Sequence, residues 1–368
     1  MKDYNWRQKR EKYQPAYNKS AESVPAETTE PPVQSAKPAK SIIAIILIIV
    51  VIVAVIIGIF TSRSGGSAAK LASVAEKYQK AVGLVTVTVE MKNGEKIIKK
   101  VGTAWAFDSK HFATNAHVAH GLKGTVETIL KIQVVNMFVQ LAKNNNCASV
   151  EEFIAKVGKE KAEALRAALL AKVIAMVNNV HADILINGTR SHALRISHVQ
   201  VHRDYGVPGR TFDPDVAVFT IEGQHDCFFE LAGEKVLHNL KSGEPVAFLG
   251  FPIENLQQDN VNLENPIASM QSGIVVAVSD FDMKDSGPAA NQMIRHNLPA
   301  TGGASGSAIF NSDGKVIALL YSGNIVGQIS FDSQVLSRAP SAAQINFGVR
   351  VDLLSGLDKP IPVNDFLK

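Results

Sequence analysis

The sequence predicts an all-β domain, a barrel or a sandwich, that is interrupted by helices and preceded by one transmembrane helix. Many short runs of β-branched and aromatic residues alternate with turn residues through the C-terminal three-quarters of the chain, as is typical of all-β barrels and sandwiches. Residues 121–180 instead have apolar residues at helical spacing. Residues 41–60 carry no charge at all.

Composition limits the partners of the folded part. Of the 368 residues, 46% are apolar and 20% are charged, which are ordinary values for a globular protein. The formal net charge is +4, but residues 1–40 hold eight Lys/Arg and five Asp/Glu, and so +3 of it. The remainder is nearly neutral, and nucleic acid is therefore not expected as a partner, since its binding needs clustered positive charge.

The N-terminal region divides into three segments. Residues 1–40 are polar, rich in scattered charge and without apolar periodicity, so we expect a disordered tail. Residues 41–60 are almost wholly Ile, Val, Leu and Ala, and about 20 such residues span a bilayer. The run begins too late and is too long for a cleaved signal peptide. Residues 61–66 are expected to form a linker.

Flanking charge predicts the orientation of this span. Lys37 and Lys40 precede it closely, with six more Lys/Arg behind them, whereas Arg63 and Lys70 follow it. The positive-inside rule then places the N-terminus in the cytoplasm. Residues 67–368 would lie in a periplasm or outside the cell.

The folded region opens with a short helix and a hairpin. Apolar spacing predicts an amphipathic helix from Ser67 to about Val82. The alternating run after it returns through Asn93-Gly94, which predicts a type I′ turn. Later strands are expected within residues 181–188, 191–201, 215–221, 244–251, 273–280, 307–323 and 345–351.

The helical interruption is expected to be a hairpin of two helices. Ser149 and Glu152 have the spacing of a capping box. Residues 159–177 are rich in Ala, Leu, Glu and Lys, which favour helix, and Asn144-Asn145-Asn146 predicts the break before them. Such a hairpin can be plain scaffold, a lid over an active site or an oligomer contact.

Three segments carry residues that are typical of chemistry. Residues 112–118 read FATNAHV and contain His117, after a strand with the sequence GTAWAF. Residues 213–219 read DPDVAVF and contain Asp215. Residues 302–310 read GGASGSAIF and contain Ser305.

Together these segments resemble the trypsin-like serine proteases, and the HtrA/Deg branch in particular. Their order of His, Asp and Ser is that of the chymotrypsin clan. The resemblance covers about residues 70–355, and residues 346–351 (NFGVRV) resemble the closing strand of HtrA-type domains. It implies a two-barrel trypsin-like fold with a helical insertion.

The resemblance also assigns roles. Ser305 would be the nucleophile, His117 its base and Asp215 the carboxylate that orients His117. Backbone N–H groups of Gly303 and Ser305 would form the oxyanion hole. Tyr321, Ser322 and Gly323 would pair with the substrate backbone, beside a pocket wall at residues 297–301 that includes Thr301. That wall holds no Asp or Glu, which favours small or medium apolar substrate side chains.

Four features of the sequence allow more than one interpretation. Asp213 competes with Asp215, and Asp215 is preferred because the family's aspartate directly precedes the apolar strand, as Asp215 precedes residues 216–219 here. His117 with His120 has the spacing of a helical metal pair, but no further ligands lie nearby, so neither a metal nor a cofactor is expected. Asn187-Gly-Thr fits a glycosylation sequon but fits a turn better. Two cysteines, Cys147 and Cys227, are too few for a disulfide scaffold, and whether they pair cannot be deduced. The Ser307 side chain departs from the more common glycine of the family.

The resulting functional hypothesis is a membrane-anchored serine endopeptidase that cleaves unfolded or extended proteins outside the cytoplasm, as in protein quality control. The chain ends soon after the closing strand, so no PDZ domain is expected, and a homo-oligomer is allowed by the resemblance. Two further hypotheses stand beside it. One is a non-proteolytic binding or chaperone-like module on a protease scaffold, and the second is a dedicated signalling protease.

Overall fold

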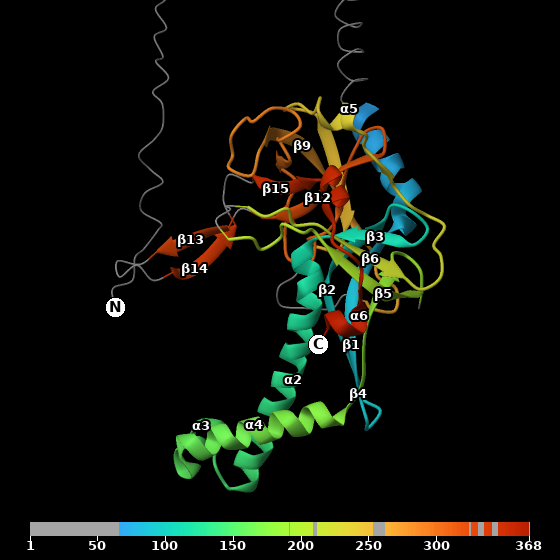
Figure 1. Cartoon of the computed structure of the whole chain (residues 1–368). Coiled ribbons are helices and arrows are strands. Elements are labelled where there is room, and N and C mark those ends of the chain that lie inside the picture. The colour runs from blue at the N-terminus through green and yellow to red at the C-terminus, as the bar shows by residue number, and fades with distance from the viewer. Residues whose placement is uncertain are drawn as a thin grey trace, which may run out of the picture. The chain divides into compact units, whose positions relative to one another are not determined.

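The computed structural model describes residues 66–367 apart from 191, 209–211, 253–261, 324, 330–334 and 341–344. In this part of the chain the strands form two β-barrels (Figure 1), in each of which six strands close on themselves and a seventh pairs at an edge. The expectation of an all-β domain with two barrels is confirmed. A short two-stranded sheet of β13 (Ile325–Ile329) and β14 (Val335–Pro340) follows the last long strand.

The first barrel has the strand order β5-β4-β1-β2-β3-β6, and β6 returns to β5. Its strands are β1 (Val82–Met91), β2 (Lys96–Ala106), β3 (His111–Thr114), β4 (Val177–Ile186), β5 (Ala193–Val201) and β6 (Ala217–Ile221), with β16 (Ile361–Pro362) at the edge of β5. Nine of the ten residues of β1 are buried, which fits a strand with both faces covered.

The predicted hairpin between β1 and β2 is present, with Val82 opposite Trp105, but its turn is not of type I′. Among the two central residues expected for that turn, only Gly94 has a positive φ, of 88°, whereas type I′ requires both. The Gly94 N–H donates to the Met91 carbonyl over 2.9 Å. The turn is displaced by one residue because the Asn93 side chain accepts the N–H of Glu95 over 3.1 Å.

The second barrel has the order β11-β8-β9-β10-β15-β12, and β12 returns to β11. Its strands are β8 (Pro245–Gly250), β9 (Ser269–Ser279), β10 (Met293–His296), β11 (Ala308–Asn311), β12 (Lys315–Ser322) and β15 (Asn346–Arg350), with β7 (Glu230–Leu231) parallel to β12 at the edge. The sequence did not predict β10, whose four residues (MIRH) alternate poorly. Its residues show little strand pattern of their own, and the pairing with β9 and β15 stabilises the strand.

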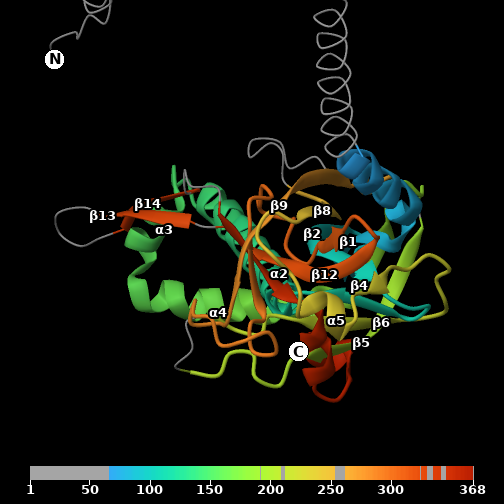
Figure 2. The same cartoon turned by 90° about the horizontal axis from the view of Figure 1, so that it is seen from above.

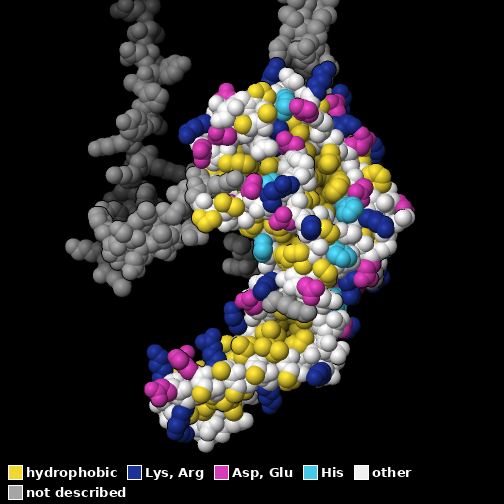
Figure 3. Space-filling view, in the orientation of Figure 1, with side chains coloured by type: hydrophobic (Ala, Val, Ile, Leu, Met, Phe, Trp, Pro, Cys, Tyr) yellow, Lys and Arg dark blue, Asp and Glu magenta, His cyan; other side chains and the backbone are white. Residues whose placement is uncertain are grey.

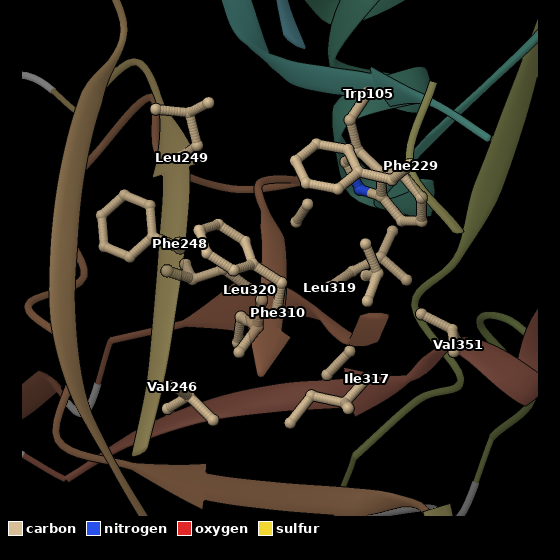
Figure 4. Close-up of a cluster of buried hydrophobic side chains, with 14 of the residues drawn as sticks. Trp105, Phe229, Val246, Phe248, Leu249, Phe310, Ile317, Leu319, Leu320 and Val351 are labelled. Atoms are coloured by element: carbon tan, nitrogen blue, oxygen red, sulfur yellow. The ribbon is translucent and has the colours of Figure 1, made fainter. Parts of the chain in front are cut away.

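The core of the second barrel extends to the first. Phe248, Phe310 and Leu319 are fully buried within it (Figure 4), and Trp105 of β2 reaches the same cluster. The Trp105 ring meets Phe229 edge-on, with ring centroids 6.0 Å apart, a favoured aromatic geometry. Through Trp105, β2 of the first barrel thereby packs into the core of the second barrel.

The N-terminal helix is also found. Residues 66–78 are helical and are followed by the 3₁₀ turn η2 (Gln79–Ala81). Leu71 and Tyr78 are buried in the same core as the second barrel. Two short helices, α5 (Glu234–Leu237) and α6 (Val363–Phe366), and the 3₁₀ helix η3 (Val351–Gly356) complete the described elements.

The insertion has three helices instead of the expected two, and it occupies residues 116–176 instead of 121–180. Its helices are α2 (Ala116–Asn144), α3 (Val150–Val157) and α4 (Lys159–Met176). Residues 177–180 belong to β4 because Val180 pairs with Val89 in the ladder with β1. The break falls at Asn146, whose φ is 54°, and Ser149 Oγ accepts the N–H of Glu152 as the helix cap.

Helix α2 changes its buried face along its length. Val118, Leu122, Val126 and Ile129 pack into the first barrel's core. From Val134 onward its apolar residues pack with α3 and α4 instead. In both views α3 lies away from the barrel strands (Figure 1, Figure 2), so the far half of α2 serves a small core of the insertion itself.

The predicted tail at residues 1–40, the transmembrane span at 41–60 and all but the last residue of the linker lie outside the described residues. Among the described residues, none of the helices has both the length and the apolar character that a bilayer crossing requires.

Candidate active site

His117 stands at the start of α2, where β3 ends. Thr114 closes β3, Asn115 is extended with φ −80° and ψ 152°, and the helix begins at Ala116. The Asn115 side chain does not cap the helix but donates to the Asp215 carbonyl over 2.8 Å. This bond between residues 100 apart in the sequence fixes the β3–α2 corner against the segment before β6.

Asp215 is fully buried and contacts His117 through both of its carboxylate oxygens. Its Oδ1 accepts the His117 backbone N–H over 2.8 Å, and its Oδ2 lies 2.5 Å from His117 Nδ1. A carboxylate in this place favours the tautomer with a proton on Nδ1, which leaves Nε2 as a base. Of the two competing aspartates, the structure places Asp215 against His117, whereas the Asp213 carbonyl only accepts the Asp215 N–H.

The Ser305 loop is a tight turn that depends on two glycines. Gly303 and Gly306 have φ of 83° and 85°, in a region that side chains disfavour. A Cβ on Gly306 would also lie 2.2 Å from the Thr103 carbonyl oxygen. The loop therefore approaches the backbone of the first barrel more closely than any residue with a side chain would allow.

Thr103 of β2 holds this loop, a role that its sequence context does not reveal. Its backbone N–H donates to the Ser305 carbonyl over 3.0 Å, and its hydroxyl donates to the Gly303 carbonyl over 2.9 Å. The same hydroxyl accepts the Phe251 N–H over 3.1 Å. Thr103 lies within the GTAWAF segment, but only the distant loop reveals what its hydroxyl does.

The backbone donors of the loop fall into two groups. The N–H groups of Ala304 and Gly306 are taken by the carbonyls of Thr301 and Leu320. Those of Gly303 and Ser305 have no acceptor among the residues that the structure describes. An oxyanion hole requires two N–H donors that are not already bonded, and the N–H groups of Gly303 and Ser305 meet this requirement.

Ser305 itself is half-buried, and between its hydroxyl and the His117 ring the structure has no hydrogen bond. The His117 side chain keeps 40% of its surface exposed. Catalytic hydrogen bonds are often long before a substrate is bound, so the absence of this bond is compatible with a serine and a base that act together.

Ser307, the departure from the family, has its side chain inside the nucleophile turn. It is fully buried, and its hydroxyl donates to the Ala304 carbonyl over 2.6 Å. Gly250 leaves room for it, since a Cβ there would lie 1.8 Å from Ser307 Oγ. The extra side chain therefore closes the nucleophile turn.

The segments expected to bind substrate lie around this pair. The Tyr321 ring centroid is 6.4 Å from that of His117, Ser322 ends β12, and Thr301 is exposed beside the nucleophile turn. A Cβ on Gly323 would lie 3.1 Å from the Ala300 carbonyl oxygen. The Gly323 backbone thus lies close to the Ala300 carbonyl, and a side chain at position 323 would be crowded by it.

Burial controls the protonation of the aromatic and histidine groups nearby. Burial, reinforced by the charge of Asp215, raises the pKa of Tyr321 to about 12, so its hydroxyl stays neutral. Burial lowers the pKa of His120, whose ring stacks on Tyr205 with centroids 5.6 Å apart. The His120 ring also lies 5.3 Å from the Phe366 ring, centroid to centroid, so it packs between two aromatic rings.

The two cysteines and Asn187 have structural places in the described part of the chain. Cys147 and Cys227 are free thiols, the first in the insertion core and the second beside the barrel core. Asn187 holds a turn, since its side chain donates to the Gln79 carbonyl and accepts the Ala268 N–H. The described residues contain no group of three or more His, Cys, Asp or Glu that could hold a metal.

Residues 102–319, more than half of the chain, match the family described as trypsin-like peptidase domain. Among solved structures, the HtrA-type protease AlgW with a decapeptide is similar at a TM-score of 0.40 and 12% identity over 77% of this chain. This chain spans 64% of that AlgW chain. Deg5 is similar at a TM-score of 0.38 and 13% identity, covering 78% of this chain and 91% of its own. No curated protein matches the sequence.

Proposed function

This chain belongs to the trypsin-like peptidase family, and we propose on that premise that it is a serine endopeptidase with Ser305, His117 and Asp215 as its catalytic triad. The observation that carries the proposal is the grip of buried Asp215 on His117 through both carboxylate oxygens. Such a contact orients one ring nitrogen toward a nucleophile and stabilises the imidazolium that forms during attack.

In the proposed reaction, Ser305 Oγ attacks the carbonyl carbon of the scissile peptide bond while His117 Nε2 removes the hydroxyl proton. The negative oxygen of the tetrahedral intermediate accepts hydrogen bonds from the N–H groups of Gly303 and Ser305, each worth about 3 kcal/mol in the transition state. His117 then passes the proton to the leaving amine. Water attacks the acyl-enzyme by the same route and restores Ser305.

We propose that the substrate is an extended polypeptide whose backbone lies along Tyr321, Ser322 and Gly323. The close approach of the Ala300 carbonyl to Gly323 supports a preference for small apolar side chains before the scissile bond. The absence of Asp and Glu from residues 297–301 gives no counter-charge for a basic side chain.

We further propose that residues 41–60 anchor the enzyme in a membrane and that the protease domain acts outside the cytoplasm, on unfolded proteins or on one membrane-proximal substrate. The uncharged twenty-residue run and the excess of Lys and Arg before it support this arrangement.

The test is labelling of the full-length protein with a fluorophosphonate, with the adduct located by mass spectrometry. The expected result is an adduct on Ser305 that is lost in Ser305→Ala and in His117→Ala. Ser272→Ala is the matched control, because Ser272 is an exposed serine of β9 outside the nucleophile turn, and it should keep the adduct on Ser305. A folded protein that never reacts would instead favour a non-proteolytic function, as a binding or chaperone-like module. The missing hydrogen bond between Ser305 and His117 gives that second candidate its weight.

A further inference from the structure

The insertion contains a cavity that the proposed protease chemistry does not use. It lies among α2, α3 and α4 and has a volume of about 470 Å³. Its walls are mainly apolar and include Val134, Phe138, Val150, Ile154, Ala162 and Leu170. Figure 3 shows the corresponding apolar surface on the insertion, with basic side chains along its border.

The insertion buries little apolar surface of its own. Its core consists of seven buried side chains, among them Phe138, Phe153 and Leu169, while Val135 at the cavity wall is 57% exposed. A concave apolar surface that is exposed and bordered by charged residues often marks a binding site. The cavity volume lies within the range of about 300–1,000 Å³ that is usual for small-molecule sites.

The border of the cavity is basic. Lys131, Lys159 and Arg166 line it, against one carboxylate, Glu163. Lys159 and Arg166 form no ion pair with any residue in the described part of the chain. Lys131 contacts only Glu127, over 3.5 Å between two exposed side chains, a pair of little strength. The cavity thus combines an apolar interior with two cations that are available for an anion.

The spacing on α4 directs these groups to one place. Lys159, Glu163, Arg166 and Leu170 follow one another at intervals of three or four residues, so they share one face of the helix. A ligand lying along this face would meet the apolar wall at Leu170 and the cations at Arg166 and Lys159. Glu163 lies between the two cations and is exposed, so its side chain would turn toward solvent when an anionic head is bound.

Charge selects among possible occupants. The border holds three cations, Lys131, Lys159 and Arg166, against one carboxylate, so it favours an anionic occupant over a neutral one. A second copy of the chain would bring the same cations against one another across a two-fold axis, which is unfavourable. A narrow hydrocarbon chain with a carboxylate at one end satisfies both the walls and the border.

We propose that this cavity binds a long-chain fatty-acid carboxylate, with the tail among Val134, Phe138 and Leu170 and the head at Arg166 and Lys159. The site is separate from the proposed active site, since Lys131 lies fourteen residues after His117 on α2, about 21 Å along the helix. Because one helix carries both His117 and the cavity wall, a bound fatty acid would contact the element that positions the catalytic base.

The test is titration of the full-length protein, held in nanodiscs of zwitterionic lipid, with the fluorescent eighteen-carbon fatty acid cis-parinarate. The expected result is saturable binding of one molecule per chain. Affinity should fall at least tenfold in the double variant Lys159→Glu/Arg166→Glu and in Ala162→Trp, which fills the cavity. Lys161→Glu is the matched control on the same helix, since Lys161 does not line the cavity, and its affinity should equal that of the wild type.

Circular dichroism of each variant establishes that the helices remain folded. The partition of cis-parinarate into the nanodisc lipid is the same in all samples, so differences between variants report binding to the protein. Equal affinities in all four proteins would overturn the proposal, as would equal competition by stearyl alcohol and stearate, because the carboxylate would then not be recognised. A third outcome would also overturn the proposal: the protein binds vesicles that contain phosphatidylserine, the double variant does not, and neither shows saturable cis-parinarate binding. The basic border would then be assigned to a membrane surface.

Discussion

Thr103 offers the sharpest test of how the nucleophile loop is held. The substitution Thr103→Val keeps the shape of this fully buried side chain but removes its hydroxyl. The Gly303 carbonyl, now 2.9 Å away, loses its donor, and the Phe251 N–H, 3.1 Å away, loses its acceptor. Each buried group left unsatisfied costs about 1–3 kcal/mol, so the free energy of unfolding should fall by about 2–6 kcal/mol.

The substitution should affect the reaction as well as stability. Without the hydroxyl, the peptide between Gly303 and Ala304 loses one of its anchors. The adjoining Gly303 N–H, one of the two proposed oxyanion donors, is then held less firmly in its direction. We expect the rate of fluorophosphonate labelling to fall by about 10²-fold, the usual effect of losing one such donor. Urea unfolding measures the first effect, and labelling under conditions where the variant is fully folded measures the second.

Thr103→Ser is the matched control, because it retains the hydroxyl and loses only a methyl group. It should cost about 1 kcal/mol and should label at close to the wild-type rate. If Thr103→Val unfolded within 0.5 kcal/mol of the wild type and labelled equally fast, the hydroxyl would have no role in holding the loop.

Further predictions concern the orienting carboxylate, the nucleophile turn and a buried histidine. Asp215→Asn should lower the labelling rate by about 10⁴-fold with the fold unchanged, and a loss of less than tenfold would argue against Asp215 as the orienting carboxylate. Gly306→Ala should lower the free energy of unfolding by more than about 2 kcal/mol in urea, because its Cβ would lie 2.2 Å from the Thr103 carbonyl oxygen. Its control is Gly124→Ala on α2, which has nothing within 4 Å of the added Cβ and should stabilise the protein by about 0.5–1 kcal/mol. Similar effects at both sites would contradict the crowding at Gly306. Burial lowers the pKa of His296 to about 4, so the folded protein holds this ring neutral while the unfolded chain protonates it near pH 6.5. The contribution of the neutral His296 ring to the free energy of unfolding is therefore complete above about pH 6.5. It is lost as the pH falls toward 4, by about 3 kcal/mol. His296→Leu should consequently show a smaller decrease in the free energy of unfolding between pH 7 and 4.5 than the wild type.

Local patterns were sufficient for most of the barrels. Alternating β-branched residues predicted the strands around Val85 and Phe248, and the apolar spacing of residues 67–82 predicted the helix that ends at Tyr78. Such patterns succeed because the period of a strand or helix is set by the backbone itself. They failed at β10, whose four residues are strand only because two neighbouring strands pair with them.

The same limit applies to the insertion. Its helical character is evident from Ala, Leu, Glu and Lys between residues 159 and 176, but the number of helices was not. The switch of α2 from the barrel core at Ile129 to its own core at Val134 blurs the apolar stripe. The start at Ala116 follows from Asn115, whose side chain is held by a carbonyl one hundred residues later.

For the candidate site, the sequence by itself determined which residues are chemically suited and in what order they occur. His117, Asp215 and Ser305 are recognisable because each lies in a short segment whose pattern is local. Only the tertiary structure decided that Asp215 and not Asp213 meets His117, that Thr103 holds Gly303 and Ser305, and that Ser307 turns inward against Gly250. These contacts join residues that are about 50 to 200 positions apart, and their geometry is set by the closure of two barrels, which no local pattern of side chains contains.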